Sequence, residues 1–324
     1  MAIYRNKISE INLSEFGKEV LEGFSQSPKS ISSKFFYNDK GSQIFREIMD
    51  MPEYYLTNCE FEILQNKGNT IFEACQFDQT YRVVELGAGD GLKTTELLRH
   101  FLTQDLSFNF SPIDISSGAI QTLEAKLKKS LPKLKFDSLI GDYYKELHKL
   151  SQTGTPTLLL FLGSNIGNYK DSEVIDLLKL FASNLKKGDK LLTGFDLKKN
   201  PQTIKLAYDD PKGITRAFNM NLLDRMQEEL GAEIDQSKFD FYSHYDPISG
   251  EVKSYLVSIE KQDIFFRNLQ QHISFEKNEL IYTELSKKYD LEQIEKLAAQ
   301  TGFEVVEHFF DSKGYFVDSL WKRS

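Results

Sequence analysis

Between about residues 81 and 196, short runs of aliphatic, β-branched and aromatic residues alternate with longer stretches of helical periodicity. The predicted strands cover residues 82–86, 108–115, 136–140, 157–162 and 190–195, and we expect helices to begin at Leu92 and Gly118. This alternation is typical of βαβ units and predicts a mostly parallel sheet. The run at 157–162, TLLLFL, is apolar on both faces, which favours a central strand.

The segments on either side have other patterns. Residues 1–75 have helical periodicity at 11–24 and 42–51, which predicts a helical cap. After residue 196, a predicted helix at 216–230 and strands near 239–245 and 252–260 indicate an α+β lobe. A helix over 291–303 and strands at 305–310 and 315–320 are expected to close the first sheet with an antiparallel pair. We therefore predict an α/β fold with a doubly wound, Rossmann-like sheet over 76–196 plus 288–324, and a second α+β domain over 1–75 plus 197–287.

Composition and charge narrow the functional classes. The 324 residues are 40% hydrophobic and 27% charged, which is typical of a globular protein. The 40 basic and 48 acidic residues give a net charge of −8, so nucleic acid and anionic membranes are disfavoured as partners. The two cysteines and five histidines have no metal-ligand spacing, and we predict no metal site. With no apolar run near the ~20 residues of a membrane span and no signal-peptide pattern, a cytoplasmic protein is expected.

A glycine-rich turn follows the first predicted strand. The segment VVELGAGDG places Gly87, Gly89 and Gly91 directly before a helix, where glycines allow a sharp turn and a close approach of ligand to backbone. A dinucleotide fingerprint has a further glycine where this chain has Leu92, and the carboxylate of Glu85 would repel a pyrophosphate. The turn therefore favours a ligand with a positive group and resembles the first motif of S-adenosylmethionine-dependent methyltransferases. A glycine turn without any ligand is the open alternative.

Two more acids follow the next two strands. Asp114 could accept hydrogen bonds from ribose hydroxyls, and Asp142 from an adenine amino group that Tyr143 covers. The carboxyl ends of parallel strands meet in one crevice, so these acids should lie close to the glycine turn. Each acid taken alone could equally be a helix N-cap. With Lys93 of the following helix, these positions and the glycine turn form the predicted site for S-adenosylmethionine, whose product is S-adenosylhomocysteine.

Five further motifs resemble a narrower family over nearly the whole chain. They are KFFYNDKGS at 34–42, PEYYLT at 52–57, FLGSNIGN at 161–168, AYDD at 207–210 with AFN at 217–219, and TELSKKY at 283–289. The chain resembles the histidine-specific Nα-methyltransferases of ergothioneine biosynthesis. The resemblance implies an S-adenosylmethionine-dependent enzyme that trimethylates the α-amino group of L-histidine to hercynine. It also implies that the first predicted domain binds the cofactor and the second binds the substrate.

The same resemblance assigns roles to residues of the substrate site. Tyr54 and Tyr208 are similar to tyrosines that bind the substrate carboxylate, and Asn168 to the asparagine that holds the α-amino group. These three are also the implied catalytic residues, because they would orient the amine. Gly163, in the same motif as Asn168, is assigned to the substrate site as well.

Three other residues are similar to those that surround the imidazole. They are Tyr37, Glu284 and Ser286. In an extended segment Glu284 and Ser286 project from one face, as two groups that contact one ring require. A solvent-facing polar strand edge is the alternative interpretation. Ser254 stands where the family pattern has a methionine, a departure that bears on the shape of the pocket.

Other functions stay open at this point. A relative that methylates a tryptophan-like amine or a histidine derivative is the nearest alternative, and a non-catalytic module that binds the cofactor is another. A nicotinamide-dependent oxidoreductase is disfavoured by Leu92 and Glu85. We expect a small-molecule substrate, no nucleic acid or membrane partner, and a monomer or weak oligomer.

Overall fold

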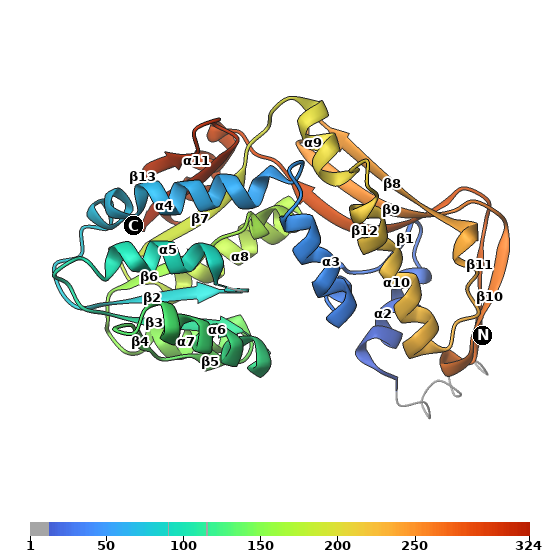
Figure 1. Cartoon of the computed structure of the whole chain (residues 1–324), viewed down its shortest axis with the longest axis horizontal. Helices are drawn as coiled ribbons and strands as arrows, with labels where there is room; N and C mark the ends of the chain where they lie inside the picture. Colours follow the sequence, from blue (N-terminus) through green and yellow to red (C-terminus); the bar gives the residue numbers. More distant parts are fainter. Residues whose placement is uncertain (1–12, 90, 115) are drawn as a thin grey trace. The chain divides into compact units, whose positions relative to one another are not determined.

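The computed structural model describes residues 13–89, 91–114 and 116–324, without the side chain of Tyr144. The chain divides into two compact units (Figure 1). The sheet unit comprises Tyr55–Lys199 and Lys287–Ser324. The lobe unit comprises the described residues up to Tyr54 together with Asn200–Ser286.

The sheet unit is built on one eight-stranded sheet. Its strands are β2 (Tyr81–Leu86), β3 (Phe108–Asp114), β4 (Lys135–Phe136), β5 (Leu139–Ile140), β6 (Thr157–Phe161), β7 (Lys190–Asp196), β13 (Phe303–Phe310) and β14 (Phe316–Arg323). The order is β13-β14-β7-β6-β2-β3-β4, and β5 also pairs with β3. Strands β2 to β7 are parallel, whereas β14 pairs antiparallel with both β7 and β13. The predicted α/β class, the central position of β6 and the closing antiparallel pair are confirmed.

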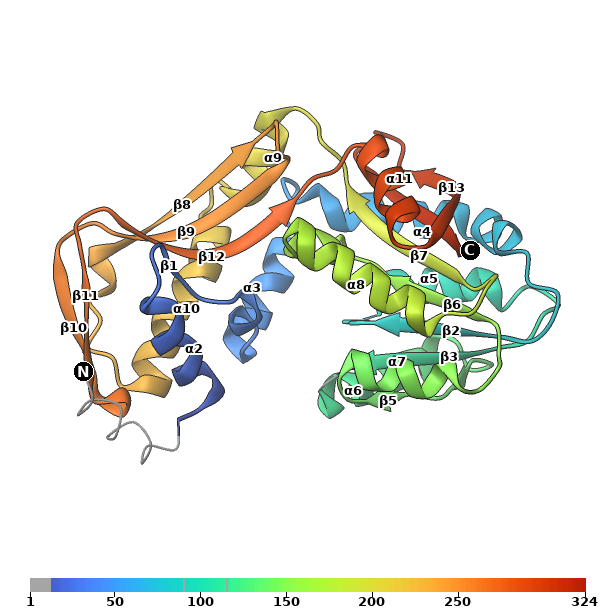
Figure 2. The same ribbon diagram turned by 180° about the vertical axis from the view of Figure 1, so that it is seen from behind.

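Helices cover both faces of this sheet. They are α4 (Tyr55–Cys75), α5 (Leu92–Phe101), α6 (Ser117–Ser130), α7 (Tyr143–Ser151), α8 (Asp171–Asn184) and α11 (Leu291–Gln300), with the 3-10 turn η2 (Asn165–Asn168). Helices α4 and α5 lie in front of the sheet in Figure 1, and α7 and α8 lie in front in Figure 2. Every residue of β2, β6 and β7 is buried because both faces are covered.

The lobe unit combines a four-stranded sheet with helices. The sheet has the order β1-β12-β9-β8, and a separate hairpin is formed by β10 and β11. The strands are β1 (Lys29–Ser30), β8 (Phe239–Asp246), β9 (Glu251–Ser258), β10 (Gln262–Phe266), β11 (Gln271–Phe275) and β12 (Glu279–Lys287). The helices are α2 (Glu15–Phe24), α3 (Asp39–Met49), α9 (Pro201–Tyr208) and α10 (Ile214–Leu230), with the 3-10 turns η1 (Ser33–Phe36), η3 (Gln236–Lys238) and η4 (Arg267–Leu269). Buried residues of α2, α10 and the strands form one core.

The structure changes three expectations from the sequence. The helical segment before residue 76 does not all belong to the cap, because α4 lies in the sheet unit and packs on α5 and β14. The chain therefore divides after Tyr54, Lys199 and Ser286, not at 75, 196 and 287. The strand expected at 136–140 is two short strands, β4 and β5. The last helix stops at Gln300, before Gly302 with its φ of 88°. Residues 11, 12 and 115 of the predicted elements lie outside the described residues.

Candidate active site

The glycine turn at the end of β2 has the geometry that its sequence predicts. Gly87, Gly89 and Gly91 have φ values of 68°, 54° and 67°, in the left-handed region that glycine enters without strain. A Cβ on Gly91 would lie 2.2 Å from Cδ1 of Leu123, so α6 packs directly on the turn. A Cβ on Gly89 would meet no described atom within 4 Å, so the backbone at this point borders open space.

Glu85 precedes this turn and is 3% exposed. The hydroxyl of Thr94, in the first turn of α5, donates a hydrogen bond to Oε1 of Glu85. A carboxylate removed from water in this way is a strong acceptor and a strong attractor of positive charge. It therefore lies where a cationic ligand of the glycine turn would benefit from it.

Asp114 and Asp142 lie at the carboxyl ends of β3 and β5. Oδ1 of Asp114 accepts a hydrogen bond of 2.8 Å from the Ser116 N–H, and Oδ1 of Asp142 accepts one of 3.4 Å from the Lys145 N–H. The contact of Asp142 is a cap at the start of α7, whereas the N-cap of α6 is Ser116, so Asp114 bonds to the capping residue and is not itself the cap. A carboxylate has two oxygens and about four lone-pair positions, so these contacts leave room for a ligand contact.

Tyr143 links the third strand to the glycine turn. Its hydroxyl lies 3.0 Å from the position that a Cβ of Gly87 would take. Burial, followed by the negative charge of Asp114, raises the pKa of Tyr143 to about 12. The hydroxyl therefore stays protonated at neutral pH beside the predicted cofactor residues, and the structure brings these residues together at one edge of the sheet.

Glu60 of α4 joins two other predicted residues. Oε1 of Glu60 accepts a 2.6 Å hydrogen bond from the N–H of Gly163, and Oε2 forms an ion pair with Lys93. Glu60 is 0% exposed. Burial lowers the pKa of Lys93, but the negative charges of Glu60, Asp318 and Glu85 together more than offset this, so the pKa of Lys93 is raised and its ammonium form is favoured. Sequence reasoning missed Glu60, because nothing in the pattern of α4 distinguishes a buried acid from a solvated one.

Five predicted substrate residues lie in the lobe unit, and aromatic contacts link three of them. Tyr54 contacts Tyr208, with ring centroids 6.2 Å apart. Phe45 lies 6.3 Å from Tyr54 and 5.4 Å from Tyr37. Phe218 of α10 lies 5.7 Å from both Tyr37 and Phe45. Residues Tyr37, Tyr54 and Tyr208, with Phe45 and Phe218, therefore form one continuous group of rings, which we call the aromatic cluster.

The other two residues lie on β12, which is an extended strand as predicted. The hydroxyls of Ser286 and Tyr208 share a hydrogen bond of 2.8 Å. Burial, followed by the carboxylate of Glu284, raises the pKa of Tyr37 well above its usual range. Tyr37 is nevertheless 49% exposed, so part of its side chain stays in contact with solvent. Glu284 and Ser286 are thus both connected to the aromatic cluster.

Gly163 and Asn168 belong to the sheet unit, unlike the other substrate residues. Gly163 follows β6 with φ of 80°, and Ser164 continues the turn with φ of 54°. Asn168 ends η2 and is exposed. Both residues therefore lie at the carboxyl end of the central strand, the same end as Glu85.

Ser254 lies on β9 and is 1% exposed. Its hydroxyl has no hydrogen-bond partner among the described residues. A buried hydroxyl without a partner carries a desolvation cost.

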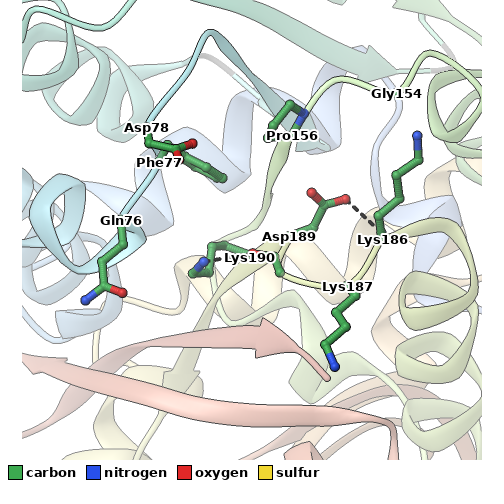
Figure 3. Close-up of a pocket in the computed structure, with 10 residues that line it drawn as sticks. Gln76, Phe77, Asp78, Gly154, Pro156, Lys186, Lys187, Asp189 and Lys190 are labelled. Carbon is green, nitrogen blue, oxygen red and sulfur yellow. Dashed lines mark hydrogen bonds between the residues drawn. The ribbon is translucent and has the colours of Figure 1, made fainter.

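A cavity of about 250 Å³ lies at the opposite end of the parallel strands (Figure 3). Its lining includes Phe77, Pro156 and Lys190, which precede or begin β2, β6 and β7. The carboxylate of Asp189 accepts a 2.8 Å hydrogen bond from the Lys186 N–H there. No predicted site residue lines this cavity.

Two further observations concern the residues that the structure describes. Within them, no three histidine, cysteine or acidic side chains are grouped so that they could hold a metal ion. None of their helices combines the length and apolar character needed to cross a membrane.

Comparison with known proteins gives one family. The model of a family described as "Histidine-specific methyltransferase, SAM-dependent" matches residues 16–323. The chain is 32% identical to a histidine N-alpha-methyltransferase of Mycolicibacterium smegmatis, over 94% of this chain and 93% of that protein. It is 30% identical to a protein of the same name from Mycobacterium tuberculosis, with the same coverage. It is 28% identical to ergothioneine biosynthesis protein 1 of Schizosaccharomyces pombe, over 89% of this chain and 38% of that protein.

Proposed function

We propose, from the premise that this chain belongs to the family of histidine-specific, S-adenosylmethionine-dependent methyltransferases, that it trimethylates the α-amino nitrogen of L-histidine to hercynine. The observation that carries the proposal is the aromatic cluster with its Tyr208–Ser286 hydrogen bond. It joins residues assigned to the carboxylate of the substrate to residues assigned to its imidazole. A connected site of this kind suits a small zwitterion with a polar ring.

The residues at the carboxyl edge of the sheet fit the cofactor of the family. Gly89 borders open space that a side chain would fill, and Glu85, which precedes the same turn in the chain, is a buried carboxylate. We assign the sulfonium end to Glu85, the ribose to Asp114, and the adenine to Asp142 and Tyr143. Lys93 follows the glycine turn and forms an ion pair with Glu60, which also accepts the hydrogen bond from the N–H of Gly163. When bound, S-adenosylmethionine supplies an electrophilic methyl group carried on a sulfonium.

The chain's own task in the reaction is to present a neutral amine in line with that methyl group. Methyl transfer needs no covalent help from the protein, so orientation is the main contribution to the rate. We assign the α-amino group to Asn168 and the carboxylate to Tyr54 and Tyr208. The hydroxyls of Tyr54 and Tyr208 can donate to the carboxylate, and the Asn168 carbonyl can accept from the amine. The amine proton can then pass to water, because no dedicated base lies among these residues.

Selection of histidine is assigned to Glu284 and Ser286. A carboxylate favours an imidazole N–H, and the serine hydroxyl can serve the other ring nitrogen as donor or acceptor. A site built from hydrogen-bonding groups discriminates strongly against a ring without them, because its own groups would lose their partners. The partly buried aromatic cluster can also stabilise the quaternary product by cation–π attraction, about 0.5–2 kcal/mol.

Mass spectrometry of purified protein with S-adenosylmethionine tests this function. L-histidine is expected to gain three methyl groups, whereas tryptophan, histamine and Nα-acetylhistidine gain none. Histamine lacks the carboxylate assigned to Tyr54 and Tyr208, and Nα-acetylhistidine has a blocked amine. Methylation of Nα-acetylhistidine would place the reaction on the ring and contradict the proposal.

The same panel separates the alternatives. Methylation of tryptophan in preference to histidine would favour a relative with another amine substrate. Binding of the cofactor without methylation of any amine would favour a non-catalytic module. The family relationship to ergothioneine biosynthesis proteins supports a role for the product in that pathway, and a cytoplasmic monomer or weak oligomer stays a prediction.

A further inference from the structure

A buried cluster of charges lies at the end of β7, outside the residues assigned to either ligand. Its centre is Asp196, which is 0% exposed. The Tyr55 hydroxyl contacts both carboxylate oxygens at 3.0 and 2.9 Å. Lys288 forms an ion pair of 2.8 Å with Oδ2, and Lys199 forms one with Oδ1. We call these four residues, all in the sheet unit, the Asp196 cluster.

The charges of this cluster are buried, so their removal from water costs free energy. The side chains of Lys199 and Lys288 are 5% and 0% exposed. Ions removed from water need close partners, so loss of the carboxylate would remove the counter-charge that Asp196 gives to two buried ammonium groups. Lys199 is further held by the Tyr55 hydroxyl at 2.8 Å, and its Nζ lies 4.2 Å from the centroid of the Tyr55 ring. Burial lowers the pKa of Lys199, and Asp196 only partly offsets this shift.

The position of each member along the chain points to a role. The chain passes between the two units after Tyr54, Lys199 and Ser286. Tyr55 is the first residue after one of these points, Lys199 is the last before another, and Lys288 follows the third by two residues. The carboxylate of Asp196 thus contacts a residue next to each of the three places where the chain passes from one unit to the other.

Besides the contacts of its carboxylate, Asp196 has a backbone partner in the loop that carries Asn168. Its N–H donates a 3.1 Å hydrogen bond to the hydroxyl of Ser164, which lies at the start of that loop. Further along the loop, a Cβ on Gly167 would lie 2.7 Å from the carbonyl oxygen of Lys287, next to Lys288. The loop therefore packs closely on the segment that the cluster fixes.

We propose that Asp196 is a positioning residue for methyl transfer, because it fixes the ends of the four segments that carry substrate-binding residues. The segments lead to Tyr54, Asn168, Tyr208 and Ser286. Asp196 itself is not assigned to either ligand. The inference rests on the proposed function for the identity of those four residues. A displacement of about 1 Å in a reacting group can cost about 100-fold in rate, so loosening these ends should lower turnover.

The test compares Tyr55→Phe with Tyr81→Phe. Tyr55→Phe removes one hydroxyl of the cluster and keeps the ring. Tyr81 is 1% exposed in the same unit, and its hydroxyl has no hydrogen-bond partner among the described residues, so Tyr81→Phe controls for loss of a buried hydroxyl. Tyr55→Phe is expected to lower kcat for histidine about 10- to 100-fold, with the Kd for S-adenosylmethionine within twofold of wild type. Tyr81→Phe should match wild type in both.

Hydrogen exchange by mass spectrometry gives a readout that does not depend on activity. In Tyr55→Phe, faster exchange is expected in segments 163–168, 199–208 and 283–289, but not in 81–101 of the glycine turn region. Unchanged kcat and unchanged exchange would overturn the positioning role, and so would equal weakening of cofactor and histidine binding. If wild-type protein does not methylate histidine but the local change in exchange occurs, the proposed function fails while the structural role of the cluster stands.

Asp196→Asn is the stronger variant. It keeps the side-chain shape but removes the charge that compensates Lys199 and Lys288, and it is expected to lower kcat more than Tyr55→Phe does. Because this variant is also at risk of not folding, the conclusion depends on Tyr55→Phe. A folded Asp196→Asn protein with wild-type kcat would overturn the proposal.

Discussion

The sheet unit and the lobe unit present different chemistry at their predicted ligand residues. In the sheet unit, the side chains at the ends of β2, β3 and β5 are carboxylates, and Glu85 is almost fully buried. In the lobe unit, most of the predicted residues are tyrosines in contact with other aromatic rings, with Glu284 as the single acid. One region therefore offers fixed negative charge, and the other offers rings and hydroxyls.

This difference matches a difference between the two proposed ligands. The sulfonium of the cofactor is a cation when it binds, so a permanent carboxylate near it lowers its free energy. The amine of the substrate must be neutral to react and becomes a permanent cation after the third transfer. A carboxylate beside the amine would favour the unreactive ammonium form, whereas aromatic faces attract the final cation without holding a proton.

The largest expected effect is on cofactor binding, which the comparison assigns to the carboxylates of the sheet unit. Asp114→Ala removes both acceptors assigned to the ribose hydroxyls. This loss should cost about 3 kcal/mol of binding free energy, so the Kd for S-adenosylmethionine should rise about 150-fold. Isothermal titration calorimetry measures this change. Asp137→Ala removes an exposed acid between β4 and β5, away from the carboxyl end of β3, and should leave the Kd unchanged. A loss below threefold for Asp114→Ala would remove this residue from the cofactor site.

The next effect concerns the lobe unit. Glu284→Ala removes one charged partner of the imidazole, which should cost about 2 kcal/mol of binding free energy. The Kd for histidine should therefore rise about 30-fold, while the Kd for the cofactor should change less than twofold. Titration of each ligand separately measures both values. Glu228→Ala, an exposed position on α10, serves as the control. Equal losses for histidine and cofactor would contradict the separation between the two units.

A third prediction concerns stability of the sheet unit. Burial, followed by the negative charge of Glu60, raises the pKa of Asp318 well above its usual value of 3.8. The folded protein then binds a proton that the unfolded chain releases, so this contribution to stability is present at low pH and is lost as pH rises through the folded pKa. Asp318→Asn is neutral at every pH and should raise Tm by about 2 °C or more at pH 9, with a smaller gain at pH 5.

Thermal unfolding followed by circular dichroism at both pH values measures this difference. A fall in Tm that is larger at pH 9 than at pH 5 would show that the carboxylate of Asp318 is charged and stabilising in the folded protein.

The smallest effect concerns Ser254. Its buried hydroxyl has no partner among the described residues, so Ser254→Ala should raise the free energy of unfolding by up to about 1 kcal/mol. Denaturant titration measures the change. Ser243→Ala, at the paired position on β8, should be neutral or destabilising. Destabilisation by Ser254→Ala would indicate that the hydroxyl has a partner in solution.

Much of the sheet unit was predictable because its signals are local. The apolar run of β6 and the glycines after β2 each reflect a requirement at their own position, namely burial on two faces and a left-handed backbone. The positions of Asp114 and Asp142 then follow from the rule that parallel strands end at one edge. The substrate residues were predicted only through the resemblance, since nothing in their spacing shows that Tyr37, Tyr208 and Ser286 approach one another.

The remaining features depend on contacts between distant segments. Helix α4 has the pattern of an ordinary helix, and only the fold shows that it packs on α5 and β14. Glu60 and Asp196 read as common acids in the sequence, yet each is completely buried against lysines from other elements. Pairings of this kind leave no periodic signal, so they could not be inferred from one chain.

The two ends of segment 200–286 lie next to each other, and this bears on how the length of the segment could change. The N–H of Lys198 donates to the carbonyl of Tyr289 at 2.8 Å, and the N–H of Tyr289 donates to the carbonyl of Asp196 at 2.9 Å. Leu197 and Tyr289 also form an isolated β-bridge, so the segment leaves and rejoins the sheet unit through two stretches of chain that lie side by side, like an insertion in a surface loop. Because the entropy of closing a loop grows only slowly with its length, such an insertion can lengthen, shorten or be exchanged at little cost to the sheet that hosts it.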